Sequence, residues 1–191
     1  CVADVTGHGI PAALGSVILK TVLQSAVEHH ADPGQILFYV NQRLIVLLPD
    51  QFVSIFIGRW NSTTTRFDYA SAGHEPGLVL TLNGGPYPLN ATGPLLGITD
   101  AAVWETEAVE LRDGERILLT TDGVAEAIAP DSRLFGRAFL ADVAADALTL
   151  PPEEAVRSIH GAVREHQAGE PPTDDLTIVI LESRPNPRAF N

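Results

Sequence analysis

Hydrophobic and polar positions follow two patterns along this chain, and the change between them falls near residue 50. Before it, apolar residues recur at helical spacing, which predicts one helix from about Ile10 to Ala31 and a second that ends near Leu48. Asp32-Pro33 is typical of a helix start, with an N-cap acceptor followed by proline in the first turn. Cys1 to Val5 is interpreted as the end of a strand that runs into a glycine-bearing turn.

The rest of the chain contains runs of β-branched and aromatic residues separated by turn residues. The predicted strands cover residues 52–60, 66–72, 77–82, 102–111, 115–121 and 176–181, and the predicted helices cover 134–147 and 152–167. Asp113-Gly114 predicts a hairpin between two of these strands. Because most strands come in hairpin-spaced runs with helices at both ends of the chain, the order favours an antiparallel α+β fold over repeated βαβ units.

Composition narrows the class of protein. Acidic residues outnumber basic ones 24 to 12, giving a net charge of −12, which disfavours binding to nucleic acid or to anionic membranes. The single cysteine, Cys1, excludes an intrachain disulfide and favours a cytoplasmic protein. No apolar run of membrane-spanning length is evident, so no membrane insertion is expected.

The boundaries of the domain are also predicted from the sequence. The chain contains no methionine and begins inside a predicted strand. We therefore expect one domain over residues 1–183, incomplete at its N-terminus, followed by a flexible tail over residues 184–191.

Acidic residues stand at the ends of three predicted strands. Asp4 follows the first strand, Asp122 follows the apolar run 117–121, and Asp174-Asp175 precede the last strand. Taken singly, Asp4 could cap a helix, Asp122-Gly123 could form a hairpin turn, and the pair could be loop acids. Taken together, they predict a site for hard divalent cations, because converging carboxylates repel one another unless cations lie between them.

A dinucleotide-binding site is the alternative for the first segment. Residues 7–12 satisfy G-x-G-x-x-A between a strand and a helix, and Glu28 lies about twenty residues further on. A second parallel strand should end near that acid, but another helix is predicted there instead. The context therefore disfavours this interpretation.

Five motifs in order resemble those of the SpoIIE/RsbU-like family, bacterial members of the PP2C-type metal-dependent phosphatases. Residues 4–14 resemble D-x-S-G-H-G-x-x-A-A and residues 69–76 resemble Y-A-N-A-G-H-x-P. Residues 93–97 resemble G-x-x-L-G, residues 119–127 resemble L-Y-T-D-G-V-T-E-A, and residues 174–177 match D-D-x-T. The resemblance implies a four-layer αββα sandwich, with two antiparallel sheets face to face and helices outside.

The resemblance also implies roles for individual residues. In this family the first aspartate bridges two metal ions, which assigns that role to Asp4, and the next residue, Val5, offers its backbone carbonyl. Asp122 and Asp174 complete the ligands, with Asp175 as the alternative to Asp174. The catalytic residues would thus act through two Mn²⁺ or Mg²⁺ ions, whose bridging hydroxide attacks the phosphorus of phosphoserine or phosphothreonine.

Other parts of the motifs have more limited implications. Gly7, His8 and Gly9 are expected to form the active-site turn, without a general-acid role for His8. His74 has no implied role beyond a structural hydrogen bond. The family carries a further acidic ligand upstream of the position at which this chain begins.

By resemblance, the substrate is a phosphorylated bacterial signalling protein, a STAS-type anti-sigma-factor antagonist. The same resemblance implies an N-terminal sensor or receiver domain in the full-length protein. The alternative function is a catalytically inactive, phosphatase-like module that binds a protein partner.

Overall fold

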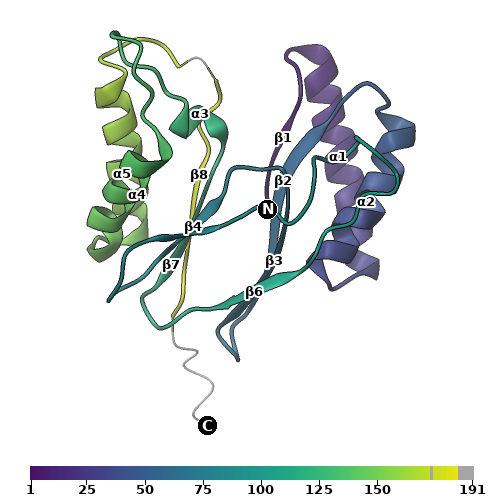
Figure 1. Ribbon diagram of the computed structural model, residues 1–191, viewed down its shortest axis with the longest axis horizontal. Coiled ribbons are helices and arrows are strands. Elements are labelled where there is room, and N and C mark those ends of the chain that lie inside the picture. Colours follow the sequence, from purple (N-terminus) through teal and green to yellow (C-terminus); the bar gives the residue numbers. More distant parts are fainter. Residues whose placement is uncertain (173, 185–191) are drawn as a thin grey trace. The chain divides into compact units, whose positions relative to one another are not determined.

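The structure, a computed structural model, describes residues 1–172 and 174–184, and these residues form two compact units. The N-terminal unit consists of Cys1–His74 and Asn90–Glu110. The C-terminal unit consists of Glu75–Leu89 and the chain from Leu111 onward. Each unit is an antiparallel sheet with helices on one face (Figure 1). The predicted tail lies outside the described residues, except for Arg184.

The sheet of the N-terminal unit has the strand order β1-β2-β3-β6. These strands are β1 (Val2–Val5), β2 (Val53–Asn61), β3 (Arg66–Ala72) and β6 (Glu107–Glu110). Two helices, α1 (Ile10–His29) and α2 (Pro33–Leu47), cover one face (Figure 1). Alternate residues of β2, such as Ile55 and Ile57, pack against α2 residues such as Leu37, because side chains on a strand alternate between its faces.

The helices of this unit agree closely with the sequence prediction. Asp32 is the N-cap of α2, and its Oδ1 accepts a hydrogen bond of 2.9 Å from the Gln35 N–H. Pro33 occupies the first turn, where a missing N–H leaves no hydrogen bond unmade. Leu47, the last residue of α2, is 51% exposed.

The helix α1 requires one correction. Among the described residues it is long and apolar enough to cross a membrane, by length and composition alone. From the sequence, no apolar run of that length was expected. Core helices of soluble proteins and signal sequences pass the same test, so this single helix is weak evidence for a membrane span.

The sheet of the C-terminal unit has the strand order β5-β4-β7-β8. Its strands are β5 (Tyr87–Leu89), β4 (Gly77–Leu80), β7 (Arg116–Thr120) and β8 (Ile178–Glu182), and its helices are α3 (Asp122–Ala125), α4 (Arg137–Asp146), the 3₁₀ turn η1 (Ala147–Thr149) and α5 (Pro152–His166). α4 and α5 cover one face of this sheet (Figure 1). The core joins Leu118 of β7 to Leu140 of α4 and to Ile159 and Val163 of α5.

The predicted hairpin at Asp113-Gly114 is wrong. β6 pairs with β3, whereas β7 pairs with β4 and β8, so the two strands on either side of the turn belong to different sheets. The turn itself exists: Gly114 has φ 80°, and its N–H donates to the Ser183 carbonyl at 2.9 Å. Asp-Gly specifies a local turn, but the strand partners are chosen by distant residues.

The α+β class, with two antiparallel sheets flanked by helices, is confirmed. The short strand β5 was not predicted, and the predicted strand 102–111 is reduced to β6. Asp4 lies within β1 and does not cap a helix, because the N-cap of α1 is Gly9.

Candidate functional site

Asp122 lies where the buried strand β7 ends and the short helix α3 begins. All five residues of β7 are buried, and Asp122 is the first residue of α3. Its Oδ1 accepts a 2.8 Å hydrogen bond from the Gly123 N–H, and the residue is half-buried. The hairpin-turn interpretation of Asp122-Gly123 is thereby excluded, and the carboxylate is placed at the rim of the sheet.

Thr121 connects the Asp174-Asp175 segment to the end of β7 through hydrogen bonds. Its Oγ1 donates to the Asp175 carbonyl at 2.9 Å and accepts from the Thr177 N–H at 3.0 Å. Its backbone N–H also donates to the Thr177 carbonyl at 3.3 Å. This buried threonine was not singled out from the sequence, although it immediately precedes Asp122. It holds residues 175–177 beside the end of β7, next to Asp122.

Gly123 allows the two acidic segments to approach closely. A Cβ atom at this position would lie 2.5 Å from the Asp175 carbonyl oxygen and 3.3 Å from the Asp174 Cβ. Any larger residue would therefore have to displace the Asp174-Asp175 backbone. The Asp174 Oδ1 accepts from the Asp175 N–H at 2.7 Å, and both residues are exposed. The structure thus brings Asp122 and Asp174, which the sequence analysis grouped, into neighbouring positions within one unit.

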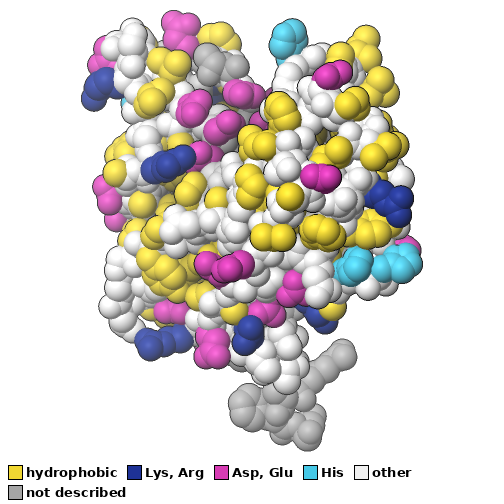
Figure 2. Space-filling model, turned by 45° about the vertical axis from the view of Figure 1, so that its right-hand side comes forward, with side chains coloured by type: hydrophobic (Ala, Val, Ile, Leu, Met, Phe, Trp, Pro, Cys, Tyr) yellow, Lys and Arg dark blue, Asp and Glu magenta, His cyan; other side chains and the backbone are white. Residues whose placement is uncertain are grey.

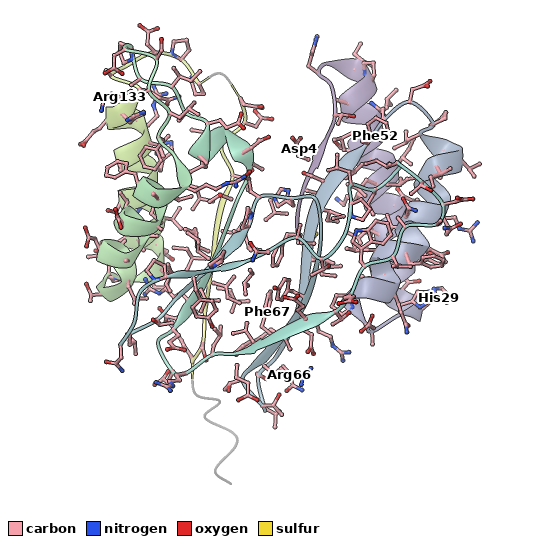
Figure 3. The ribbon with its side chains drawn as sticks, in the orientation of Figure 1. Asp4, His29, Phe52, Arg66, Phe67 and Arg133 are labelled. Carbon is pink, nitrogen blue, oxygen red and sulfur yellow. The ribbon has the colours of Figure 1, made fainter. Side chains whose placement is uncertain are left out.

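Asp4 lies in β1 of the N-terminal unit (Figure 3). It is directly opposite Ser54 in the antiparallel ladder, and Val5 is opposite Val53. The turn after β1 is held by two 2.9 Å hydrogen bonds, from the Thr6 N–H to the Phe52 carbonyl and from the Phe52 N–H to Thr6 Oγ1.

The predicted active-site turn follows directly. Gly7 and Gly9 have φ values of 98° and 73°, a region that favours glycine, and His8 between them is exposed. The conformation explains the two glycines, while the catalytic role of the turn stays a prediction.

Ser54 and His74 form a polar pair on the same sheet face as Asp4. Ser54 Oγ and His74 Nδ1 are 2.8 Å apart, and His74 is only 6% exposed. The structural hydrogen bond expected for His74 is therefore confirmed. Residues directly opposite in a ladder point to the same face, so this pair supports the side of the sheet on which Asp4 lies. No signal in the sequence connects Ser54 to His74.

Two of the recognised motifs contact each other in this unit. The Ser71 carbonyl accepts from the Thr92 N–H at 2.9 Å, and the Gly93 carbonyl accepts from the Gly73 N–H at 3.1 Å. Gly73 has φ 58°, and a Cβ there would lie 2.7 Å from the Leu95 side chain. The motif at residues 69–76 and the motif at residues 93–97 are therefore held together by backbone hydrogen bonds and close packing next to His74.

The described residues contain no group of three or more Asp, Glu, His or Cys side chains arranged to hold a metal ion. Asp122 and Asp174 belong to the C-terminal unit and Asp4 to the N-terminal unit. The metal-ligand roles of Asp4, Val5, Asp122, Asp174 and Asp175 stay predictions.

The sequence profile of the family described as Stage II sporulation protein E (SpoIIE) matches residues 1–184, nearly the whole chain. The chain belongs to the SpoIIE family. This confirms the resemblance that the five sequence motifs indicated.

Among curated relatives, the SpoIIE-family chain is similar to the phosphoserine phosphatase RsbU of Bacillus subtilis. The two are 31% identical over 186 residues, which cover 96% of this chain and 55% of RsbU. The phosphoserine phosphatase RsbP of the same organism is 24% identical to this chain. The chain spans about half the length of these two curated relatives.

Solved structures support the same fold. The SiaA-PP2C domain of Pseudomonas aeruginosa superposes with a TM-score of 0.85 at 22% identity, covering 94% of this chain and 72% of that one. The phosphatase domain of SpoIIE from Bacillus subtilis, presoaked with manganese, gives a TM-score of 0.61 at 14% identity, covering 88% and 74%. The PP2C-like fold is therefore confirmed.

Proposed function

We propose that this SpoIIE-family chain is a metal-dependent protein phosphatase that hydrolyses phosphoserine or phosphothreonine on a bacterial signalling protein. The observation that carries the proposal is the arrangement at the end of β7. There, Thr121 and Gly123 together hold Asp174 beside Asp122. Membership of a family whose relative RsbU is a phosphoserine phosphatase supports the same activity.

The donor chemistry of this arrangement fits hard divalent cations. Asp122 and Asp174 supply carboxylate oxygens, and hard oxygen donors without sulfur or imidazole favour Mg²⁺ or Mn²⁺ over zinc. Two such neighbouring carboxylates also repel each other, which a cation relieves. The manganese presoak of the SpoIIE phosphatase domain is consistent with this choice.

The chain's own residues have separate tasks in this proposal. Asp122 and Asp174 would serve one cation, Asp4 would serve both cations, and the Val5 carbonyl would serve one of them. When bound, the cations supply an activated water and neutralise the charge of the phosphoryl group. Thr121 positions the Asp174 segment, and the Ser54–His74 pair stabilises the sheet face next to Asp4.

The substrate and cellular context are proposed from the relatives. A phosphoserine on a STAS-type anti-sigma-factor antagonist is the candidate substrate, because the chain resembles RsbU over 96% of its length. A cytoplasmic location and an N-terminal sensor or receiver domain complete the proposal.

The test is phosphate release from p-nitrophenyl phosphate and from a phosphoserine peptide, with and without manganese. Asp122→Asn should abolish manganese-dependent release, because it removes a charged ligand while preserving shape. Asp142→Asn is the matched control, since Asp142 is an exposed aspartate of α4, and it should leave the rate unchanged. A folded wild-type protein without turnover in any divalent metal would instead favour the inactive binding module.

A further inference from the structure

The corner between α1 and α2 contains a groove made of two adjoining hollows, which we call the corner groove. The first hollow, of about 360 Å³, is lined by His30, Gln35, Phe38, Tyr39, Gln42 and Arg43. The second, of about 350 Å³, is lined by residues that include His30, Ile36, Ile57 and Arg59. His30 lines both hollows, so they adjoin at this residue, and all of these residues belong to the N-terminal unit.

The walls of the first hollow have the composition of a protein-binding surface. The Tyr39 ring lies 5.3 Å from the His30 ring and 5.2 Å from the guanidinium carbon of Arg43. Hydrogen bonds with Ser25 and Arg43 lower the pKa of the Tyr39 hydroxyl. Phe38 beside them is 44% exposed. Aromatic residues and arginine are enriched at protein interfaces, where they anchor a partner.

The charge of the corner groove is opposite to that of the chain as a whole. Arg43 and Arg59 form no ion pair with any described residue, although the chain has 24 acidic residues and 12 basic ones. Arg59 donates one hydrogen bond, from Nη1 to the Ala31 carbonyl at 3.3 Å, out of the five N–H groups of a guanidinium. Asp32 is engaged as the N-cap of α2. Asp68, which lies opposite Arg59 in the β2–β3 ladder, is paired with Arg66 at 2.6 Å.

The surrounding surface agrees with this description. His29 lies at the end of α1, next to the corner (Figure 3). Figure 2, in which the α1–α2 side comes forward, shows histidine side chains close to apolar ones on this face. Each hollow therefore combines apolar lining with an arginine, and the shared histidine lies between them.

We propose that the corner groove is a docking site for an acidic peptide segment of a partner protein. The segment places one apolar side chain in each hollow and its carboxylates against Arg43 and Arg59. Nucleic acid is a poorer occupant, because two arginines in a chain of net charge −12 cannot track a phosphate backbone. The proposal is independent of the proposed phosphatase activity.

The experiment measures the fluorescence anisotropy of a short labelled peptide that carries two phenylalanines among glutamates. Two matched peptides have glutamine or lysine in place of every glutamate. The wild-type chain should bind the glutamate peptide, bind it less tightly as salt rises, and bind neither matched peptide comparably. Equal binding of the glutamine peptide, or no binding of the glutamate peptide, would overturn the proposal.

Variants locate the binding on the chain. The double charge reversal Arg43→Glu with Arg59→Glu should weaken binding at least about tenfold, because it replaces two attractions by repulsions. Lys20→Glu is the control, since Lys20 is exposed on α1 about 15 Å along the helix from His30. Equal weakening by the control would contradict the assignment.

A second copy of this chain is the competing occupant. Size-exclusion chromatography of the wild type and the double variant distinguishes it. We expect both proteins to elute at the same volume. If the wild type instead self-associates and the double variant does not, the occupant of the corner groove is a second copy of this chain and not a partner peptide. Thermal unfolding of each variant verifies that it is folded before its binding is compared.

Discussion

Replacing Gly123 by alanine is the sharpest perturbation of the candidate site. The added Cβ would lie 2.5 Å from the Asp175 carbonyl oxygen, whereas ordinary contact begins at 3.4 Å, so the carbonyl must withdraw by about 0.9 Å. The Asp174 Cβ, 3.3 Å from the same position, must shift by a smaller amount. The displaced backbone carries the proposed metal ligand.

The effects on activity and on stability can be separated. A misplacement of about 1 Å at a catalytic group can lower turnover about a hundredfold. Overpacking costs about 1 to 3 kcal/mol of unfolding free energy, partly offset by about 1 kcal/mol from the better helix propensity of alanine. Gly123→Ala should therefore remain folded while its manganese-dependent turnover falls about a hundredfold.

The assay is steady-state hydrolysis of p-nitrophenyl phosphate, combined with urea unfolding of the same preparations. Gly161→Ala is the control, because Gly161 lies within α5 and nothing is within 4 Å of an added Cβ. It should raise stability by about 0.5 to 1 kcal/mol and leave turnover unchanged. A folded Gly123→Ala protein with wild-type turnover would refute the reasoning.

Three further predictions concern the supporting contacts. Thr121→Val should lower the free energy of unfolding in urea by about 1 to 3 kcal/mol and raise the manganese concentration needed for half-maximal activity. Thr121→Ser, which keeps the hydroxyl, should leave both quantities close to their wild-type values. Ser54→Ala should lower stability in thermal unfolding by about 1 kcal/mol, because His74 loses its 2.8 Å hydrogen bond to Ser54. It should also raise the manganese concentration needed for activity. An unchanged manganese requirement would leave the Ser54–His74 pair a purely structural role. Arg116→Met should lower the free energy of unfolding in urea by about 3 kcal/mol, since the Arg116 side chain is only 5% exposed and loses its ion pair with Glu182. Arg66→Met, at an exposed ion pair, should lower it by at most about 1 kcal/mol. Equal losses of stability would contradict the argument from burial.

Much of the fold follows from local patterns in the sequence. The start of α2 was predictable because Asp32 and Pro33 act within one turn of the helix. The strand β3 was predicted with its observed bounds, since its ends are marked by a polar turn and by Gly73. The pairing of β6 and β7 was not predictable from Asp113-Gly114, because sheet membership depends on residues far along the chain.

The candidate site shows the same limit. Asp122 and Asp174 were grouped with Asp4 by their place at strand ends, and the structure shows that the segments of the first two are neighbours. The contacts that hold them, from Thr121 and Gly123, involve pairs more than fifty residues apart, for which a single sequence contains no signal. The Ser54–His74 hydrogen bond was likewise not predictable, since Ser54 lies in none of the motifs and the motif that contains His74 does not specify its partner.

The most direct test of the account is phosphate release from a phosphoserine peptide, measured across manganese concentrations for the wild type, Asp174→Asn and Asp175→Asn. The two aspartates are adjacent and exposed, so each variant is the control for the other. The account predicts manganese-dependent release by the wild type, its loss in Asp174→Asn, and most of it retained in Asp175→Asn. Wild-type protein without manganese-dependent release, or an Asp174→Asn protein as active as the wild type, would contradict the account.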